Sequence, residues 1–328
     1  MEFVRHYEER DSQSAYALGR FRREDNAFIL SEFSKPSPFG SRLASFNSDY
    51  TVLIAPDGSG FSFSGEVAMT SGDAHGKQWS IRDKDSNHAW LPFIFDTDRD
   101  HDDYSVEYLP GSIKISSIKE KIASSLTITT SNSGSYEIWL IKLHNLSAKT
   151  RELTFDTYVC PYSNARGEIS ISDSGKTISL TGDAAARNLG WNDGVLFFGS
   201  SLKPSRYHTS TSLFYAKGGE FDLGEEPVVE ENPVLGVSLD IELPIEGEAV
   251  LGFCFGRSDT VKKAQEICES KNGTEWLINE IELVKQQWKN AVSTISCSSN
   301  DNNFDALVST WLPYEVLTEW LSARNTME

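Results

Sequence analysis

Long apolar runs are missing from this sequence of 328 residues, and no stretch approaches the ~20 apolar residues of a membrane span. The opening residues 1–6 lack the apolar segment of a secretory signal peptide. We therefore expect a cytoplasmic protein that makes no contact with a membrane.

Cysteine and histidine are scarce as well. The four cysteines form no C-x-x-C pair, and the six histidines show no H-x-x-x-H or H-E-x-x-H spacing. In a chain that is not exported, we expect these cysteines to be reduced thiols. The spacings give no reason to expect a zinc site or any other metal site.

Basic residues are outnumbered by acidic ones. The chain has 30 Lys and Arg against 48 Asp and Glu, which gives a formal net charge of −18. A surface this acidic repels nucleic acid and anionic membranes, and it argues against a large polyanionic substrate. Neutral sugars remain compatible with this charge.

Short strand patterns fill the chain between Asn26 and Phe255, separated by clusters of Gly, Ser, Asn, Asp and Pro. The expected strands are Tyr50–Ala55, Tyr104–Tyr108, Ser112–Ile118, Ser125–Thr129, Tyr136–Leu143, Arg151–Val159, Thr177–Leu180, Val195–Gly199, Val237–Leu243 and Ala249–Phe255. Roughly 230 residues of this pattern exceed an immunoglobulin-sized sandwich. The sequence therefore predicts a mainly β fold with a large antiparallel double sheet.

The pattern becomes helical after Ser258. Asp259 is positioned to cap a first helix, a second is expected from about Thr274 to Ile295, and Pro313 should kink or end a third. The last segment is rich in apolar residues that need a cover, Trp311 and Trp320 among them. We expect three parts: an N-terminal segment at 1–25, a sandwich at 26–256 and a helical segment at 257–328.

Several blocks in a fixed order carry a family resemblance: Lys35–Ser41, Thr51–Phe63, Trp79–Asp83, Tyr136–Val159 and Phe304–Tyr314. This order resembles the N-terminal supersandwich domain of the cellobiose and chitobiose phosphorylase family, glycoside hydrolase family 94, formerly glycosyltransferase family 36. The chain departs from that family where Phe39 replaces Trp, and where Phe61 and Phe63 replace Tyr and Trp.

The resemblance implies a β-supersandwich like that of galactose mutarotase, followed by a helical linker. In the family a catalytic (α/α)6 barrel comes next, so residues 257–328 would hold the linker and the first helix of a barrel that is missing here. The resemblance further implies carbohydrate binding and dimerisation without catalysis by this chain alone. The implied partners are an oligosaccharide or sugar phosphate, a barrel in cis or in trans, and a second copy in a homodimer. No cofactor is implied beyond phosphate as the co-substrate of a full-length phosphorylase.

Three places could contact a saccharide. Ser59 and Phe61 lie in a Gly-rich segment that reads as a hairpin turn. Trp79, Arg82 and Asp83 combine stacking and hydrogen-bonding groups, although ordinary strand packing is the favoured explanation for them. Asp98 and Asp100 belong to an acidic loop at 96–107 whose spacing partly matches a calcium loop, but His101 stands where such a loop needs glycine.

Three functions remain open at this stage. The first is the non-catalytic carbohydrate-binding domain of a glycoside phosphorylase-like enzyme that acts on β-linked gluco-oligosaccharides. The second is a stand-alone carbohydrate-binding or scaffold protein, which requires Trp311 and Trp320 to be buried. The third is a mutarotase-like epimerase, which requires a His and Glu pair in one concave cleft.

Overall fold

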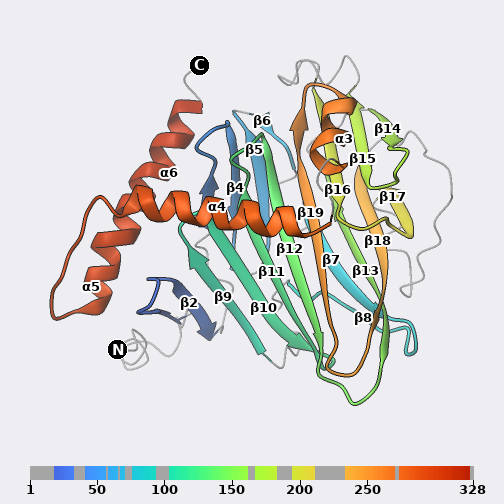
Figure 1. The fold of residues 1–328 in the computed structure, drawn as a ribbon, viewed down its shortest axis with the longest axis horizontal. Helices are drawn as coiled ribbons and strands as arrows, with labels where there is room; N and C mark the ends of the chain where they lie inside the picture. Colours follow the sequence, from blue (N-terminus) through green and yellow to red (C-terminus); the bar gives the residue numbers. More distant parts are fainter. Residues whose placement is uncertain are drawn as a thin grey trace, which may run out of the picture.

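Antiparallel β-sheets make up most of the molecule. The computed structural model describes residues 18–32, 41–56, 58–65, 67–70, 76–93, 103–161, 167–182, 194–210, 233–269 and 273–325. Its strands form sheets of ten, five and four strands, and helices from the C-terminal part of the chain cross the outside of the largest sheet (Figure 1). This architecture confirms the predicted fold class, a mainly β protein with large antiparallel sheets and a C-terminal helical segment.

The ten-stranded sheet has the order β1-β2-β9-β10-β11-β12-β19-β16-β15-β14. Its strands are β1 (Leu18–Phe21), β2 (Phe28–Glu32), β9 (Asp103–Leu109), β10 (Ser112–Lys119), β11 (Ile122–Thr130), β12 (Tyr136–Asn145), β19 (Glu248–Ser258), β16 (Val195–Ser200), β15 (Thr177–Gly182) and β14 (Gly167–Ile171). Buried and part-exposed residues alternate along β9 and most of β11. This period of two means that one face of the sheet enters the core while the other faces outward.

Two smaller sheets pack against the inner face. The five-stranded sheet consists of β17 (Arg206–Ser210), β18 (Pro233–Leu243), β13 (Arg151–Val159), β7 (Lys77–Asp83) and β8 (Ala89–Trp90), in that order. The four-stranded sheet consists of β3 (Ser41–Ala44), β4 (Tyr50–Ile54), β5 (Gly60–Ser64) and β6 (Val67–Ala68). Each strand expected from the sequence overlaps a strand of one of the three sheets.

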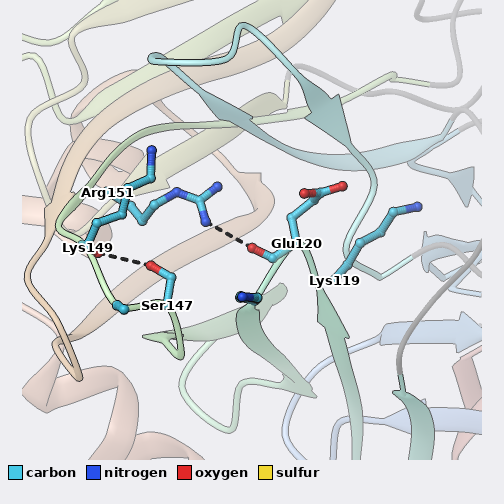
Figure 2. Close-up of a pocket in the computed structure, with 7 residues that line it drawn as sticks. Lys119, Glu120, Ser147, Lys149 and Arg151 are labelled. Atoms are coloured by element: carbon cyan, nitrogen blue, oxygen red, sulfur yellow. Dashed lines mark hydrogen bonds between the residues drawn. The ribbon is translucent and has the colours of Figure 1, made fainter.

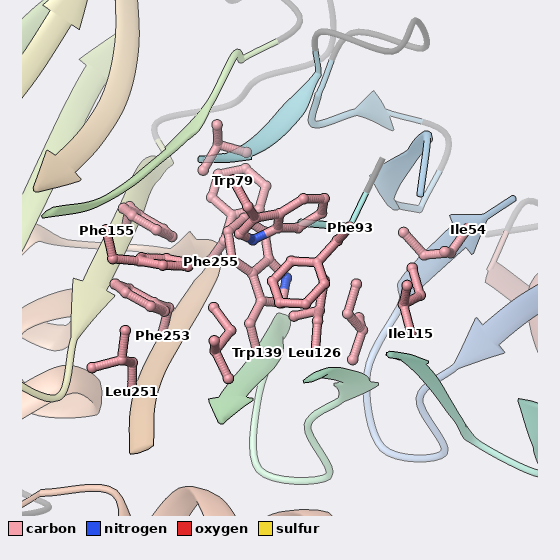
Figure 3. Packing of buried hydrophobic residues seen from close by; sticks show 14 of the residues in the cluster. Ile54, Trp79, Phe93, Ile115, Leu126, Trp139, Phe155, Leu251, Phe253 and Phe255 are labelled. Atoms are coloured by element: carbon pink, nitrogen blue, oxygen red, sulfur yellow. The ribbon is translucent and has the colours of Figure 1, made fainter. Parts of the chain in front are cut away.

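Aromatic side chains fill the space between the sheets (Figure 3). The ring centroid of Trp79 on β7 lies 5.1 Å from that of Trp139 on β12 and 6.1 Å from that of Phe93. Phe198 and Phe253 stack with their centroids 5.6 Å apart. Burying each such ring contributes roughly 1.5–3 kcal/mol, so this core holds the sheets together.

The helices are α3 (Val261–Glu269), α4 (Glu275–Val292), α5 (Asn302–Ala306), the π-helix η2 (Leu307–Trp311) and α6 (Leu312–Asn325). α4 lies across the strands of the ten-stranded sheet in Figure 1. Its residues Leu277 and Ile281 are buried in one cluster with Ile138 and Phe197 of that sheet. The outer face of the sheet is therefore apolar beneath the helices.

Two details of the helical segment differ from the expectation. Thr260, not Asp259, caps α3, because its Oγ1 accepts a hydrogen bond from the N–H of Lys263. The Asp259 carboxylate instead pairs with the Lys263 ammonium at 2.7 Å. Pro313 does not end the helix, because it is the second residue of α6, which continues directly from the π-helix η2. A π-helical turn lengthens the local hydrogen-bond spacing next to this proline.

A buried ion pair connects all three sheets. Lys77 Nζ on β7 lies 2.8 Å from Glu137 Oε2 on β12, and both side chains are at most 1% exposed. The Ser62 hydroxyl on β5 donates to the same carboxylate oxygen at 3.1 Å. Burial raises the pKa of Glu137 and lowers that of Lys77, while the opposite charge of each partner counteracts the shift. One carboxylate thus joins β5, β7 and β12.

Removing one partner of this pair should be costly. We expect Lys77→Met to lower the free energy of unfolding by about 3–5 kcal/mol, because Glu137 is left buried without its cation. The double variant Lys77→Met/Glu137→Gln should lose clearly less than the two single losses combined. Urea denaturation measures both. Lys114→Met is the control, since its pair with Glu107 is 40% exposed on the lysine side and should contribute under ~1 kcal/mol. Additive losses would contradict the coupling.

Candidate functional site

The predicted site residues do not gather in one place. Trp79 is fully buried in the core, where no saccharide can reach it, so it packs the sheets and does not stack on a sugar. Arg82 and Asp83 are neighbours on β7 and therefore point to opposite faces. Asp98 and Asp100 lie outside the described residues.

Ser59 and Phe61 lie on the β4–β5 hairpin of the four-stranded sheet. The N–H of Ala55 donates to the carbonyl of Ser59 at 2.8 Å, and Gly58 has a φ of 83°, which glycine adopts readily. Phe61 packs edge-on against Phe63 with ring centroids 4.9 Å apart. This hairpin belongs to a different sheet from Arg82, so the two predicted contacts do not form a common site.

Asp83 has a structural role at the end of the sandwich. Its Oδ2 accepts a hydrogen bond from Arg151 Nε at 2.5 Å, and its Oδ1 accepts one from the Ser86 N–H at 2.8 Å. Burial alone would raise the pKa of this carboxyl, but the bonds from Ser86 and the charge of Arg151 together lower it below its usual range. Asp83 therefore stays ionised and anchors the turn after β7.

A polar surface, which we call the outer polar face, lies on the side of the five-stranded sheet away from the core. Alternate residues of β7, β13 and β18, such as Ile81, Phe155 and Leu239, belong to the core. The residues between them must point the other way. Those residues are Gln78, Ser80, Arg82, Thr154, Asp156, Tyr158, Ser238 and Asp240, joined by His208 and Arg206 of β17.

Hydrogen bonds connect the side chains at the centre of this face. Ser238 Oγ donates to Asp156 Oδ1 at 2.5 Å and lies 2.7 Å from His208 Nε2. A Cβ at Gly236 would lie within 2.9 Å of the Cβ atoms of Tyr158 and His208, so only glycine lets these side chains pack here. Side chains from β13, β17 and β18 therefore pack closely against one another at this point.

The face is buried at its centre and open at its rim. Asp156, Ser238 and His208 are at most 2% exposed. Arg82 is part-exposed, and Arg206 and Asp240 are exposed. Among the described residues, Asp156 Oδ2 and Ser80 Oγ are buried without a hydrogen-bond partner. Buried polar atoms that lack partners are costly.

Ser238, His208 and Asp156 are the residue types of a hydrolytic triad, but their order is wrong for one. In such a triad the imidazole lies between the hydroxyl and the carboxylate, and takes the hydroxyl proton. Here the hydroxyl lies between the other two and donates to Asp156. The arrangement can bind and orient polar ligands, but it does not activate Ser238 as a nucleophile.

Histidine and glutamate also meet at exposed strand ends. His144 Nε2 lies 3.4 Å from Glu246 Oε2, which belongs to a side chain that is 70% exposed. His144 and its cross-strand neighbour Glu248 line a hollow of about 290 Å³ on the outer face of the ten-stranded sheet. A second histidine–glutamate pair lies elsewhere, with His88 Nε2 3.6 Å from Glu120 Oε1 and both side chains about half exposed. The outer polar face, by contrast, brings His208 to an aspartate.

The helical segment exposes a second kind of surface. Tyr314 and Leu321 of α6 are buried against Trp288 of α4, and Trp311 Nε1 donates to the carbonyl of Asn26 at 2.8 Å. Trp320, however, is 58% exposed. The other large apolar residues that α4, η2, α5 and α6 expose are Ile278, Leu283, Phe304, Leu307, Leu312 and Val316. We call this set the helical apolar surface; exposed apolar area of this kind is typical of an interaction site.

Sequence reasoning named Arg82, which lies on the outer polar face, but did not name Asp156, His208 or Ser238. The available signal was the alternation within Arg151–Val159, where Thr154 and Asp156 alternate with Leu153 and Phe155. Nothing in the sequence indicated that β17 and β18 would bring His208 and Ser238 beside them, because that depends on strand pairing.

Comparison with known proteins identifies the sandwich. Residues 44–189 match the family model described as the glycosyl hydrolase 94 supersandwich domain, which confirms the resemblance seen in the sequence. The 3-O-beta-D-glucopyranosyl-beta-D-glucuronide phosphorylase of Paenibacillus borealis is 21% identical over 328 aligned residues. That alignment takes in 92% of this chain and 41% of the relative, so the chain spans less than half of the relative's length.

Two solved structures share the fold. A human-microbiome protein assigned by inference as a kojibiose phosphorylase superposes with a TM-score of 0.56 at 9% identity, over 94% of this chain and 43% of its own. A bacterial glucoamylase in complex with acarbose superposes with a TM-score of 0.57 at 12% identity, over 90% of this chain and 44% of its own. At these identities the likeness shows the fold alone.

Asp83 offers a test of its anchoring role. We expect Asp83→Asn to lower the free energy of unfolding by about 3 kcal/mol at pH 7, because Arg151 loses its buried partner. The folded-state pKa of Asp83 lies below its unfolded value of about 3.9, so its contribution is present above that pH and lost as the pH falls through the folded pKa. The difference between wild type and variant should therefore shrink in acid. Urea denaturation from pH 7 to pH 3 measures this.

The neighbouring exposed pair provides the matched control. Asp85 is 56% exposed and lies 3.0 Å from Lys149, so Asp85→Asn should change stability by under ~1 kcal/mol at every pH. An Asp83→Asn variant as stable as the Asp85→Asn variant would refute the anchoring role.

Proposed function

We propose that this chain, a relative of the glycosyl hydrolase 94 supersandwich domain, is the carbohydrate-binding and assembly part of a glycoside phosphorylase-like enzyme, and is non-catalytic by itself. The observation that carries the proposal is the supersandwich match over residues 44–189. The alignment with a phosphorylase over 92% of the chain supports it. The name of that relative describes a β-linked glucosyl unit, which favours β-linked gluco-oligosaccharides as ligands here.

The outer polar face supports saccharide binding. A sugar offers neighbouring hydroxyls that both donate and accept, and this face offers a guanidinium at Arg82, a carboxylate at Asp156 and a hydroxyl at Ser80. A hydrogen bond between a sugar hydroxyl and a charged group contributes about 1.5–3 kcal/mol. Arg82 would meet the ligand first, because it is part-exposed while Asp156 is buried.

The bond-breaking chemistry would come from a separate catalytic domain. Phosphorolysis with inversion needs a positioned acid and a phosphate that attacks from the opposite side. Phosphate would therefore be the co-substrate of the complete enzyme. We propose that a helical barrel, joined in cis or in trans, supplies this site and covers the helical apolar surface, and that the assembled enzyme is a homodimer in the cytoplasm. Among the described helices, none is long and apolar enough to cross a membrane.

A stand-alone binding or scaffold protein is the second candidate. It shares the outer polar face with the first, and so binds sugars equally well. The exposure of Trp320 favours the first candidate, because a protein that acts alone should bury such a side chain.

Saccharide binding tests the function directly. We expect cellotriose to bind the wild-type chain and Arg82→Gln to weaken the Kd at least tenfold, because one charged hydrogen bond is lost. Isothermal titration calorimetry measures this. The control is Arg20→Gln, which removes an exposed arginine from the edge strand β1 and should leave the Kd unchanged. No binding to wild type, or equal weakening in both variants, would rule out the outer polar face as the site.

The helical apolar surface should govern association of the chain. We expect the wild type to self-associate at tens of micromolar, and Val316→Ser/Trp320→Ser to remain monomeric, because burying these two side chains contributes roughly 1.5–3 kcal/mol each. Size-exclusion chromatography with light scattering measures the mass. Ile245→Ser, at a side chain that is 55% exposed on another surface, should behave as wild type. A monodisperse wild-type monomer would favour the stand-alone candidate.

A further inference from the structure

We propose that a pocket at one end of the sandwich binds the phosphate group of a small anion. The pocket lies between the β10–β11 turn and the β12–β13 loop and has a volume of about 640 Å³ (Figure 2). It is lined by Lys119, Glu120, Lys121, Ser147, Ala148, Lys149 and Arg151. None of these residues belongs to the outer polar face, so the inference goes beyond the proposed function.

The charge of the pocket is opposite to that of the chain. Four of its seven lining residues are cations, in a protein whose net charge is −18. Lys119 and Lys121 form no ion pair with the described residues. Lys149 pairs with Asp85, but both side chains are more than half exposed, so solvent weakens that pair. Arg151 is paired with the buried Asp83, and Glu120 adds one carboxylate to the lining. An anion that enters the pocket therefore meets two cations, Lys119 and Lys121, that have no ion-pair partner among the described residues.

Buried polar residues hold the pocket in shape. Asn145 is fully buried, and its amide donates to the carbonyls of Lys149, Leu243 and Pro244. Its Oδ1 accepts the N–H of Ser147 at 2.9 Å. This set fixes the β12–β13 loop before any ligand arrives, which lowers the entropy cost of binding.

Arg151 spans the pocket and joins its two sides. Its Nη1 donates to the carbonyl of Glu120 at 2.9 Å (Figure 2). Its Nε donates to Asp83 Oδ2. The two Nη2 donors take part in neither bond. A phosphate oxygen accepts such donors well, because the guanidinium fork matches the spacing of phosphate oxygens.

The β10–β11 turn carries backbone strain. Glu120 and Lys121 both adopt left-handed φ angles, 53° and 60°, which glycine or asparagine would adopt more easily. The Leu146 N–H donates to the Lys121 carbonyl at 2.9 Å and clamps the turn to the neighbouring loop.

These features favour a compact phosphate over a polyanion. A phosphate dianion can accept hydrogen bonds from several ammonium groups at once, whereas the net charge of −18 on the chain disfavours nucleic acid. The volume also leaves room for a sugar attached to the phosphate. Inorganic phosphate and a sugar phosphate share this chemistry, so the experiment must separate them.

Calorimetric titration of the full chain with inorganic phosphate, glucose 1-phosphate and glucose tests the proposal. We expect both phosphates to bind and glucose alone not to bind at this pocket. Lys119→Gln/Lys121→Gln should weaken phosphate binding at least tenfold. Tighter binding of glucose 1-phosphate than of phosphate would identify a sugar phosphate as the ligand, and equal binding would identify the phosphate group alone.

Controls separate a built site from general charge. Lys262→Gln/Lys289→Gln makes the same change in net charge at exposed helical positions and should leave the Kd unchanged. Lys121→Gly should raise the melting temperature while it weakens phosphate binding, because strain and cation are removed together. Arg82→Gln should leave phosphate binding intact, which separates this pocket from the saccharide site.

Three results would overturn the proposal: no binding of phosphate by wild type, equal weakening in the Lys262→Gln/Lys289→Gln control, or a lower melting temperature for Lys121→Gly with phosphate binding unchanged. The last result would show that Lys121 has a purely structural role.

Discussion

The ion pair between Lys77 and Glu137 constrains how the three sheets meet. A carboxylate with no access to water requires a cation and hydrogen-bond donors at close range, and these come from β7 and β5. The pair tolerates little relative movement, since a shift of an ångström or two would leave both charges buried and unpaired. Apolar packing around Trp79 and Trp139 stabilises the sandwich but is non-directional. The ion pair, by contrast, requires one relative position of the three sheets.

That arrangement gives the five-stranded sheet two different faces. Its inner side is held against the large sheet by Phe155 and its neighbours, so the period of the strands places Asp156 and Ser238 on the opposite side. The polar residues there are concentrated on β7, β13 and β18, where three adjacent strands each contribute every second residue. A surface of this kind suits a ligand with many hydroxyls, because it offers donors and acceptors at the regular spacing of a sheet.

Polar contacts between turns, and helices outside the large sheet, shape the rest of the surface. At one end, Asp83, Arg151 and Asn145 use their polar groups to tie turns to each other, which leaves lysines free to project. On the outside of the large sheet, α4 covers an apolar stripe and, with α6, presents the helical apolar surface. Saccharide binding, anion binding and domain assembly are thus proposed for separate surfaces, each supported by the same sandwich.

The sequence by itself determined the strand pattern, the change to helix after Ser258 and the family resemblance, because alternation and helical periodicity are local properties. It also identified Arg82 as a polar residue on a strand. The burial of Trp79 was decided only by the tertiary structure, since a tryptophan on a strand can face the core or the solvent. The same holds for the meeting of Asp156, Ser238 and His208, and for the cations around Arg151. These groups come from strands and turns far apart in the chain, and only the pairing of those strands brings them together.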